Sequence, residues 1–493
     1  MFLFWHKYKY FPYEKELAIR EVQAIFPGVS YTFIKNGIEI SASTNDPLIQ
    51  KKLSRLVYFS SFGDQKHVSH TIQGKLEATN QKRQTTRYSS HGIHEYKGKF
   101  NPQIVHALLN IFSVMPGQRV LDPFCGSGTT LLECTHLGIN SDGTDINPLA
   151  VFIANAKQEA LETPAQSFIS ALRKIETSFR SSRKVPIDCN TSRNKYLLQW
   201  FDPSVLSDIE TLRALLIQCP VNIKNYFLTI ASNLLREYSF QDPNDLRIRR
   251  RKTPIPTTPF FEQFTEKAIE NIKTIEMAQD VLGPQKGIGQ AHCLDIRSVG
   301  LDSKDLYDFV VTSPPYATAL PYIDTQRLSL VWLEMIKPDQ IMTLDMSLIG
   351  SREIRNKQLQ EGMSILELNE REIPKIQYEF CQKLNKSVSK SDGFRRQAVP
   401  YLMYRYFADM RDMFITVHKL VKKDSFFALV VGSNHTTLGG TKITIDTPLH
   451  LSWIAQSCKW DVQETINLQT YQRYGYNIRN ATTSESLLVL RAK

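Results

Sequence analysis

A small hydroxyl residue, two prolines and an aromatic residue follow directly on an apolar run in the second half of the chain. The run 309–312 has the composition of a buried strand, and Ser313-Pro314-Pro315-Tyr316 ends it. Two adjacent prolines cannot continue a strand ladder, and their locked φ holds the neighbouring carbonyl in one direction. The four residues therefore present a fixed carbonyl, a hydroxyl and a ring at a strand end. In isolation, the same residues would be an ordinary proline-rich turn.

A second chemical feature is the glycine loop in "VLDPFCGSGTT", which stands between a strand and a helix. Gly126 and Gly128 permit a tight turn and let a ligand lie against bare backbone. In a doubly wound sheet, ligands bind at the carboxyl ends of the strands, near the point where the strand order reverses. The loop is neither a Walker A sequence nor GxGxxG, so we do not expect a nucleoside triphosphate.

Two acids follow further strands of the same pattern. Asp145 ends the next strand about 20 residues after the loop, which suits hydrogen bonds to a ribose diol. Its alternative role is the N-cap of the following helix. Asp295, in "HCLDIRS", ends a third strand and could accept the amino hydrogens of an adenine. Its alternative is an ordinary solvated loop acid, and taken alone the two are equally favoured.

Together these motifs resemble those of the S-adenosylmethionine-dependent DNA amino-methyltransferases. "DPFCGSGTT" is similar to their cofactor loop and "TSPPY" to their catalytic motif. The segment 93–112 resembles the motif that precedes the loop, with Lys97-Gly98 where Pro-Ala is usual. The resemblance is to a bacterial branch with a helical insertion, covers roughly residues 88–160 and 290–493, and leaves the N-terminal module outside.

The resemblance implies S-adenosyl-L-methionine as cofactor and double-stranded DNA as partner. It also implies that the target base is flipped out of the duplex, and that a cognate restriction endonuclease or another defence component accompanies the enzyme. The cofactor-binding residues that it implies, together with the acids above, are Lys99, Phe100, Asp122, Pro123, Phe124, Gly126, Gly128, Asp145 and Asp295.

The chemistry of amine methylation explains the prolines. The lone pair of an exocyclic amine is delocalised into the base, so the nitrogen must become more tetrahedral before it attacks a sulfonium methyl. Two fixed acceptors aimed at its hydrogens, the Ser313 hydroxyl and the Pro314 carbonyl, favour that change. Pro315 adds rigidity, and Tyr316 would stack on the base. The gain comes from preset dipoles and alignment, without a covalent intermediate.

Several alternatives are open for the target base and for the class of function. Serine at the first motif position usually accompanies N4 of cytosine in the family, whereas adenine-specific members more often have Asp or Asn. We therefore expect cytosine N4, with adenine N6 as the alternative. A tRNA guanine-N2 methyltransferase is a third hypothesis, because some carry a similar N-terminal module before "DPFCG". A non-catalytic nucleic-acid binder with a decayed enzyme fold is a fourth.

The overall charge of +11 and the pI of about 9.1 favour a polyanionic partner. The run "RIRRRK" is the candidate phosphate contact, since such contacts give affinity rather than sequence choice. Its basic residues are Arg247, Arg249, Arg250, Arg251 and Lys252.

The seven cysteines include no CxxC pair, and His91 with His94 lacks a third ligand, so no metal site is predicted. No signal peptide or membrane span is recognisable in the sequence, so we expect a cytoplasmic location.

The elements that must position these residues suggest an α/β protein. Residues 1–62 read as a small ferredoxin-like module with the pattern βαββα, and the polar residues 63–90 as a linker. Residues 91–160 and 291–493 read as a doubly wound, Rossmann-like methyltransferase sheet. Residues 161–290 have helical periodicity and form a mainly helical insertion. Target recognition is expected in 161–290 or 325–400.

Overall fold

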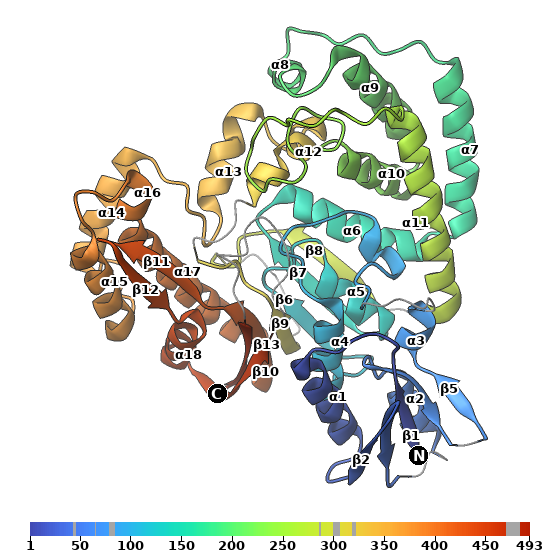
Figure 1. The fold of residues 1–493 in the computed structure, drawn as a ribbon, viewed down its shortest axis with the longest axis vertical. Helices are drawn as coiled ribbons and strands as arrows, with labels where there is room; N and C mark the ends of the chain where they lie inside the picture. Colours follow the sequence, from blue (N-terminus) through green and yellow to red (C-terminus); the bar gives the residue numbers. More distant parts are fainter. Residues whose placement is uncertain are drawn as a thin grey trace.

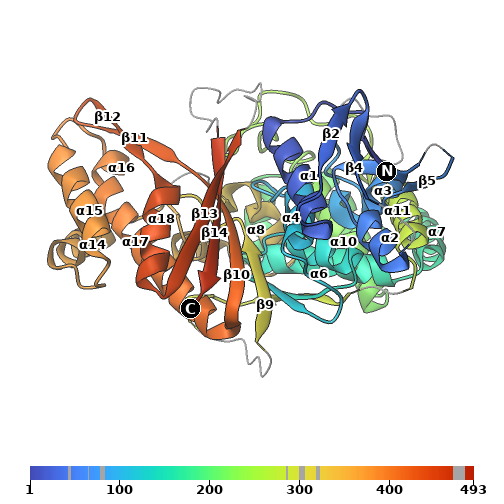
Figure 2. The same cartoon turned by 90° about the horizontal axis from the view of Figure 1, so that it is seen from below.

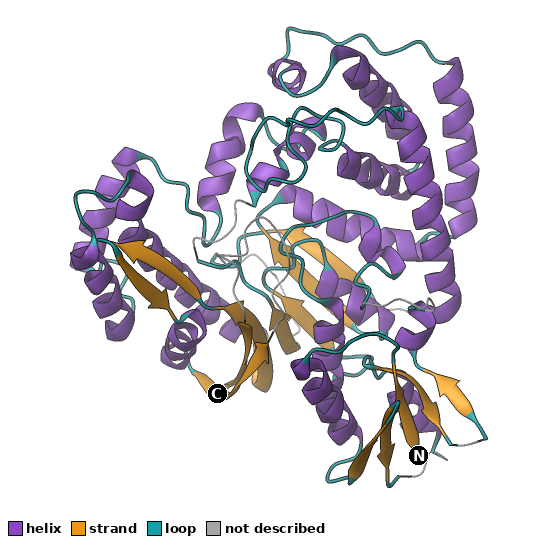
Figure 3. Cartoon of the chain, in the orientation of Figure 1, coloured by secondary structure: helices purple, strands orange, loops and turns teal. Residues whose placement is uncertain are grey.

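The computed structural model describes residues 1–42, 46–64, 66–77, 84–284, 287–298, 306–317, 322–469 and 484–493. Within these ranges the strands form a seven-stranded sheet, a five-stranded sheet and a two-stranded hairpin, with helices around them (Figures 1 and 3). None of the described helices is long and apolar enough to cross a membrane.

The central sheet has the strand order β13-β14-β10-β9-β6-β7-β8. The strands from β10 to β8 run parallel, and β14 is antiparallel to both of its neighbours. The order reverses at β6, which has β7 on one side and β9 on the other, so the switch point lies there. The doubly wound α/β fold is thus confirmed. The strands are β6 (Arg119–Asp122), β7 (Asn140–Asp145), β8 (Gly289–Cys293), β9 (Tyr307–Thr312), β10 (Val421–Gly432), β13 (Trp460–Gln469) and β14 (Ser484–Ala492).

Both faces of the central sheet are buried, because successive strand side chains point in opposite directions. Val310 packs into a core with α17 (Val399–Leu420) and α18 (Thr447–Ser457). Its neighbour Val311 packs into a core with α4 (Pro102–Ile111) on the other side. Helices α5 (Thr129–His136) and α6 (Pro148–Glu162) contact β7 and β8. Burial on both faces explains why Phe309, Val310 and Val311 of β9 are consecutive apolar residues.

The N-terminal module has the ferredoxin-like order β-α-β-β-α-β, with sheet order β2-β3-β1-β4-β5 and antiparallel pairing throughout. The expected end at residue 62 and the expected linker 63–90 are wrong in part. β5 and α3 lie in that segment, and Gln73 and Leu76 are buried there. The elements are β1 (Phe2–Trp5), α1 (Pro12–Ile25), β2 (Tyr31–Ile34), β3 (Gly37–Ile40), α2 (Pro47–Ser54), β4 (Phe59–Gly63), β5 (Val68–His70), α3 (Ile72–Leu76) and the short η1 (Ser89–Gly92).

This module shares its core with the catalytic sheet. Leu17 of α1 and Leu108 of α4 belong to one buried cluster that also contains Val430 of β10 and Leu468 of β13. At the rim of the same contact, Arg20 pairs with Glu464 of β13 at 2.8 Å. The module is therefore packed onto one face of the catalytic sheet rather than tethered beside it.

Five helices lie within the predicted insertion 161–290, although residues 235–259 contain no described helix. These helices form a bundle over the β7–β8 side of the sheet, at the top right of Figure 1. The core of this bundle also contains Leu328, Trp332 and Ile341, so the insertion as folded includes residues beyond the expected limit at 290. The elements are α7 (Ala165–Ser181), α8 (Ser192–Leu198), α9 (Pro203–Ile217), α10 (Val221–Leu234), α11 (Phe260–Leu282), η2 (Ile323–Thr325) and α12 (Arg327–Trp332).

A second helical block lies at the opposite end of the molecule, next to α17 and α18 (Figure 2). It is made of α14 (Asn356–Leu368), α15 (Lys375–Ser387), α16 (Phe394–Gln397) and the hairpin β11 (Asn434–Leu438) with β12 (Thr441–Ile445). The preceding η3 (Pro338–Gln340) and α13 (Ile341–Ser347) pack instead with the insertion. The carboxyl ends of the central strands thus lie between two helical blocks (Figure 1).

Candidate active site

The glycine loop follows β6 and leads into α5, and both of its glycines are required. Gly126 and Gly128 have φ of +49° and +81°, which L-residues with side chains rarely adopt. A Cβ on Gly128 would stand 2.8 Å from the Ala154 Cβ of α6. A Cβ on Gly126 would meet the Tyr96 ring at 3.4 Å. The loop is therefore a tight cradle, bounded by α6 and by the ring of Tyr96.

Asp122 ends β6, and its carboxylate points into the protein. It accepts hydrogen bonds from the Thr130 hydroxyl of α5 and the Thr312 hydroxyl of β9, each at 2.5 Å. It also accepts from the Phe124 N–H at 3.0 Å. Burial raises the pKa of Asp122 to about 6. The side chain, expected from the resemblance to contact the cofactor, instead joins the loop, α5 and the strand that carries the catalytic motif.

Asp145 ends β7 beside the loop and is half-buried. Its carboxylate accepts from the Gly126 N–H at 3.1 Å and from the Asn147 N–H at 2.8 Å. Burial raises its pKa to about 6. The N-cap of α6 is Asn147 and not Asp145, so the alternative role proposed for Asp145 is wrong. Its contact with a ribose stays a prediction, now with the carboxylate placed against the loop.

Asp295 lies two residues beyond the end of β8, which stops at Cys293. Both carboxylate oxygens accept from the Arg297 guanidinium, at 2.9 and 2.6 Å. Arg297 also pairs with Asp409 of α17 at 3.1 Å. The expectation that Asp295 ends the strand is wrong, and its carboxylate is already occupied by a cation. An adenine contact would have to share that carboxylate with Arg297.

The catalytic motif lies at the switch point. β9 ends at Thr312, the residue that donates to Asp122, and Ser313 follows at once. Ser313 and Tyr316 are half-buried, whereas Pro314 is buried. The Tyr316 hydroxyl donates to the Glu485 carboxylate of β14 at 2.6 Å. Tertiary structure thus brings the motif next to the glycine loop, 190 positions away along the chain.

Lys99 and Phe100, which precede the glycine loop and were predicted to bind the cofactor, contact other parts of the protein. The Lys99 ammonium donates to the Thr86 carbonyl at 2.8 Å, and burial lowers its pKa to about 7. Phe100 packs against the core shared with the N-terminal module. Tyr96, which we did not predict as a site residue, is the one whose ring lies over Gly126. In the sequence, the signal for Tyr96 as a site residue was its position in the motif that precedes the glycine loop.

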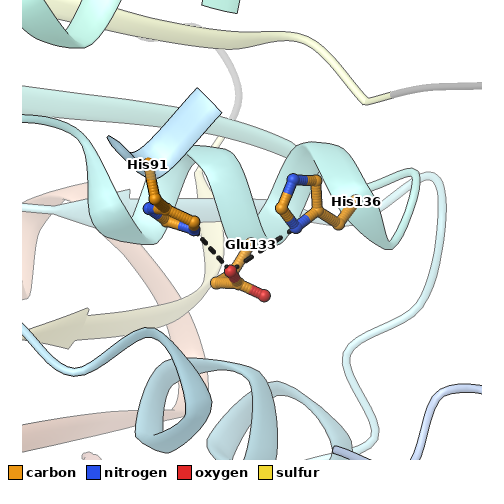
Figure 4. A group of neighbouring side chains, drawn as sticks. All are labelled: His91, Glu133 and His136. Atoms are coloured by element: carbon orange, nitrogen blue, oxygen red, sulfur yellow. Dashed lines mark hydrogen bonds and ion pairs between the residues drawn. The ribbon is translucent and has the colours of Figure 1, made fainter. Parts of the chain in front are cut away.

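Beneath the loop lies a buried polar network centred on Glu133 of α5 (Figure 4). His91 Nε2 and the Tyr88 hydroxyl each donate to one carboxylate oxygen at 2.7 Å, and His106 Nδ1 donates to the other at 2.8 Å. His136 Nδ1 is 3.4 Å away. His106 faces acceptors on both sides, because its Nε2 contacts the Arg55 carbonyl. The histidines hold the pKa of Glu133 well below its usual range.

Within the described residues, His91, Glu133 and His136 are close enough for a shared ion. Hydrogen bonds already use both oxygens of Glu133, and the Ser89 hydroxyl contacts His136 Nε2 at 2.9 Å. His94 is turned elsewhere, toward the Glu95 carbonyl and the Ser232 hydroxyl. The geometry is that of a hydrogen-bonded cluster that anchors residues 88–91 to α4 and α5. In the sequence, the signal for this cluster was Glu133, a charged residue within a buried helix.

The basic run divides into two groups. Arg250 donates to the Gln199 carbonyl and Arg251 to the Glu237 carbonyl, so these two side chains hold the chain in place. Their role in phosphate binding stays a prediction, and Arg250 is exposed. Arg247, Arg249 and Lys252 are exposed, although Arg249 pairs with Asp245 at 3.2 Å.

Two further arginines adjoin this group. The positive charges of Arg247 and Arg395 lower the pKa of Arg352, and burial lowers it most. Arg395 belongs to α16 of the second helical block, and Arg352 follows α13. The basic surface thus extends from the insertion to the second helical block, which the local run of charges did not predict.

Comparison with known proteins agrees with this geometry. Residues 1–156 match the family model described as DNA methylase. Because the match begins at residue 1, it includes the N-terminal module that the motif resemblance had left outside. The chain is 24% identical over 293 residues to the type II methyltransferase M.MvaI of Kocuria varians, covering 55% of this chain and 64% of that protein. The similarity therefore spans less than two thirds of the length of M.MvaI.

Two further proteins are similar to this chain, one over most of its length and one over a short segment. The chain is 23% identical over 411 residues to the type II methyltransferase M.AvaI of Nostoc sp., covering 76% of this chain and 80% of that protein. A segment of 52 residues is 38% identical to a tRNA (guanine(10)-N2)-dimethyltransferase of Methanothermobacter thermautotrophicus, covering 10% of this chain and 16% of that protein. The glycine loop and the Ser-Pro-Pro-Tyr motif lie side by side at the switch point, and residues 1–156 of the chain are similar to the DNA methylase family.

Proposed function

We propose that the protein is an S-adenosylmethionine-dependent DNA methyltransferase that methylates the exocyclic N4 amine of cytosine, as the modification enzyme of a restriction-modification or defence system. The observation that carries this proposal is the hydrogen bond from Thr312 to Asp122. It joins the last residue before Ser313-Pro314 to the strand that opens the glycine loop. A cofactor in the loop and a base at the motif would then be neighbours.

The residues around the loop fit a nucleoside cofactor. Gly126 and Gly128 expose backbone at positions where side chains would collide, and Asp145 offers a half-buried carboxylate at the adjoining strand end. S-adenosylmethionine would supply an activated methyl on a sulfonium centre. The roles of Lys99 and Phe100 would then be indirect, because Lys99 donates to a carbonyl and Phe100 packs in a core.

At the motif, the Ser313 hydroxyl and the Pro314 carbonyl would accept the two amine hydrogens and so favour a tetrahedral nitrogen. Tyr316 would stack on the base. The amine nitrogen would form its bond to the methyl carbon as the sulfonium–methyl bond breaks, leaving a neutral thioether, and the amine would then lose one proton to water. Alignment and preset dipoles supply the rate enhancement. Because the amine must reach this pocket, the base leaves the duplex.

Contact with the DNA backbone is assigned to cations on the insertion and on the second helical block, of which Arg352 is half-buried and the others are exposed. Arg247, Arg249 and Lys252 would contact phosphates from one side, and Arg352 and Arg395 from the other. Such contacts hold the duplex without reading its sequence. The base-reading elements would then be helices of the two flanking blocks. Serine at position 313 is what favours cytosine N4 over adenine N6.

A tRNA guanine amine is a second candidate, favoured by two specific observations. The N-terminal module has the ferredoxin-like topology that motivated this hypothesis. One of the similar proteins is named as a tRNA guanine-N2-dimethyltransferase, although the match covers only 10% of this chain. Ser313 argues against it, because such enzymes usually have Asp at that place.

The test is nucleoside mass spectrometry after incubation with isotope-labelled S-adenosylmethionine and either unmethylated duplex DNA or bulk tRNA. We expect labelled 4-methyldeoxycytidine. Labelled 6-methyldeoxyadenosine would keep the site but refute the inference from Ser313, and a label in tRNA alone would favour the second candidate. No transfer, with binding of cofactor and DNA retained, would indicate a non-catalytic binder.

A matched pair of serine variants tests the site. S313A removes one of the two acceptors and should lower transfer by at least about 100-fold, with cofactor affinity unchanged, because loss of one preset dipole costs about 10²–10³ in rate. S54A removes an exposed hydroxyl at the end of α2 and should leave transfer unchanged. Full activity of S313A would refute the assignment of Ser313.

A further inference from the structure

We infer that Glu485 is a positioning residue for methyl transfer, acting through the ring of Tyr316. This inference rests on the function proposed above. The Tyr316 hydroxyl donates to Glu485 Oε1 at 2.6 Å, which is the length of a charge-assisted hydrogen bond. Glu485 lies on β14, far from every motif that the sequence revealed, and 169 positions from Tyr316.

The fold explains why a residue of β14 reaches this site. β14 runs antiparallel to β10, with Glu485 opposite Gly432. Because its direction is reversed, its first residues lie at the edge of the sheet where the parallel strands end. That edge carries Ser313 and the glycine loop. The reversed strand therefore places a carboxylate at the catalytic edge.

The backbone of Tyr316 is held from a second side. A Cβ on Gly350 would stand 2.6 Å from the Tyr316 carbonyl oxygen, so the segment after α13 presses closely on it. The Asn434 amide donates to the Ala317 carbonyl at 2.7 Å. With its backbone enclosed and its hydroxyl tied to Glu485, the ring has one orientation. A ring fixed in this way is a preformed surface for a base to stack on.

The direction of the hydrogen bonds then follows from the donors present. An ionised carboxylate only accepts, so the Tyr316 proton is committed to Glu485. Removal of the Glu485 charge would therefore release the Tyr316 hydroxyl, and the ring would lose the contact that fixes its orientation.

The first experiment compares E485Q with wild type under saturating cofactor and DNA. Glutamine keeps the shape but removes the charge, so kcat should fall about 10- to 100-fold, the range expected for removal of a hydrogen bond to a charged group. KM for DNA and the Kd for S-adenosylmethionine should not change, because Glu485 touches neither. E485D should recover part of the rate. E464Q, a charge removed from neighbouring β13, should match wild type.

A double-mutant cycle with Y316F separates the proposed role from general damage to the sheet. If Glu485 acts only through the Tyr316 hydroxyl, E485Q in the Y316F background causes no further loss of activity. Additive effects, or a wild-type kcat in E485Q, would overturn the inference while leaving the proposed function intact. Failure of the wild-type protein to methylate either nucleic acid would overturn both.

Discussion

At the scale of single residues, the site depends on positions where another side chain would not fit or would lose its hydrogen bonds. Gly128 combines a positive φ with a close approach to Ala154. Asp122 uses its carboxylate to bind two hydroxyls and one N–H. The motif that resembles a cofactor loop is therefore partly a scaffold. Its conformation is what brings a bare backbone and Asp145 together.

Gly128→Ala tests this close approach. The added Cβ would meet Ala154 at 2.8 Å between two backbones and would also force an unfavourable φ. We expect a loss of at least about 2 kcal/mol in the free energy of unfolding, measured by urea denaturation, since such strain alone costs about 1–3 kcal/mol. Gly117→Ala is the control, because its φ is +94° but nothing lies within 4 Å of its Cβ. Equal losses of stability in both variants would mean that φ alone matters.

At the scale of elements, two buried carboxylates join helices that are distant in sequence. Glu133 links α5 to α4 and to residues 88–91 through three histidines and Tyr88. Glu21 of α1 accepts from the Val57 N–H at 3.2 Å and from the Asn110 amide of α4 at 2.7 Å. The first is bonded to histidine rings, whereas the second accepts from a backbone N–H and a side-chain amide. Replacing each glutamate by a neutral glutamine should therefore change the stability of the protein in opposite directions.

Glu133→Gln should destabilise the protein. The substitution leaves the histidine cluster, with His106 donating from both nitrogens, without its buried anion. Breaking one partner of a buried charged pair costs roughly 3–5 kcal/mol. Thermal and urea unfolding should both show the loss of stability. Glu162→Gln, at the exposed end of α6, should unfold like wild type. An unchanged stability of Glu133→Gln would mean that the cluster is not ionised.

Glu21→Gln should instead make stability less dependent on pH. Burial raises the pKa of Glu21 from 4.5 to about 8. A raised pKa means that the folded state binds the proton more tightly, so this contribution is complete below pH 4.5 and is lost as pH rises through about 8. The slope is roughly 1.4 kcal/mol per pH unit.

Urea unfolding at about pH 5, 6.5 and 8 measures this effect across the interval in which a raised carboxyl pKa alters stability. The variant should gain stability relative to wild type as the pH rises, because its amide stays neutral. Glu16→Gln, on the exposed side of the same helix, is the matched control and should follow wild type. A constant difference between Glu21→Gln and wild type across these pH values would contradict the assignment.

At the scale of the whole molecule, the catalytic edge lies between two helical blocks that contribute cations to one basic surface. Arg247 comes from the insertion, whereas Arg352 and Arg395 belong to the block beyond α13. The N-terminal module serves a different purpose, since its helix α1 packs with α4 on one face of the sheet. Substrate contacts and structural support thus use different sides of the fold.

The triple variant Arg247→Ala, Arg352→Ala, Arg395→Ala should weaken DNA binding equally for all sequences. Each phosphate that is no longer neutralised should reduce the slope of log K against log salt by about 0.9. Fluorescence anisotropy between about 50 and 200 mM salt measures this slope. Alanine substitution of Arg173 and Lys174, on the exposed face of α7, removes charge elsewhere and should keep the slope. An unchanged slope in the triple variant would move the phosphate contacts to another surface.

The sequence by itself determined the local chemistry: the glycine loop, the proline-bounded strand end, the helical insertion and the alternation of strands and helices. These features depend on backbone constraints and periodicities that act within a few residues. It did not reveal that Asp122 faces Thr312, that Arg297 occupies Asp295, or that Arg250 and Arg251 bind carbonyls. Partners for polar side chains come from strand order and helix packing, which join distant positions. Only the tertiary structure, through the reversal of β14, could place Glu485 at Tyr316.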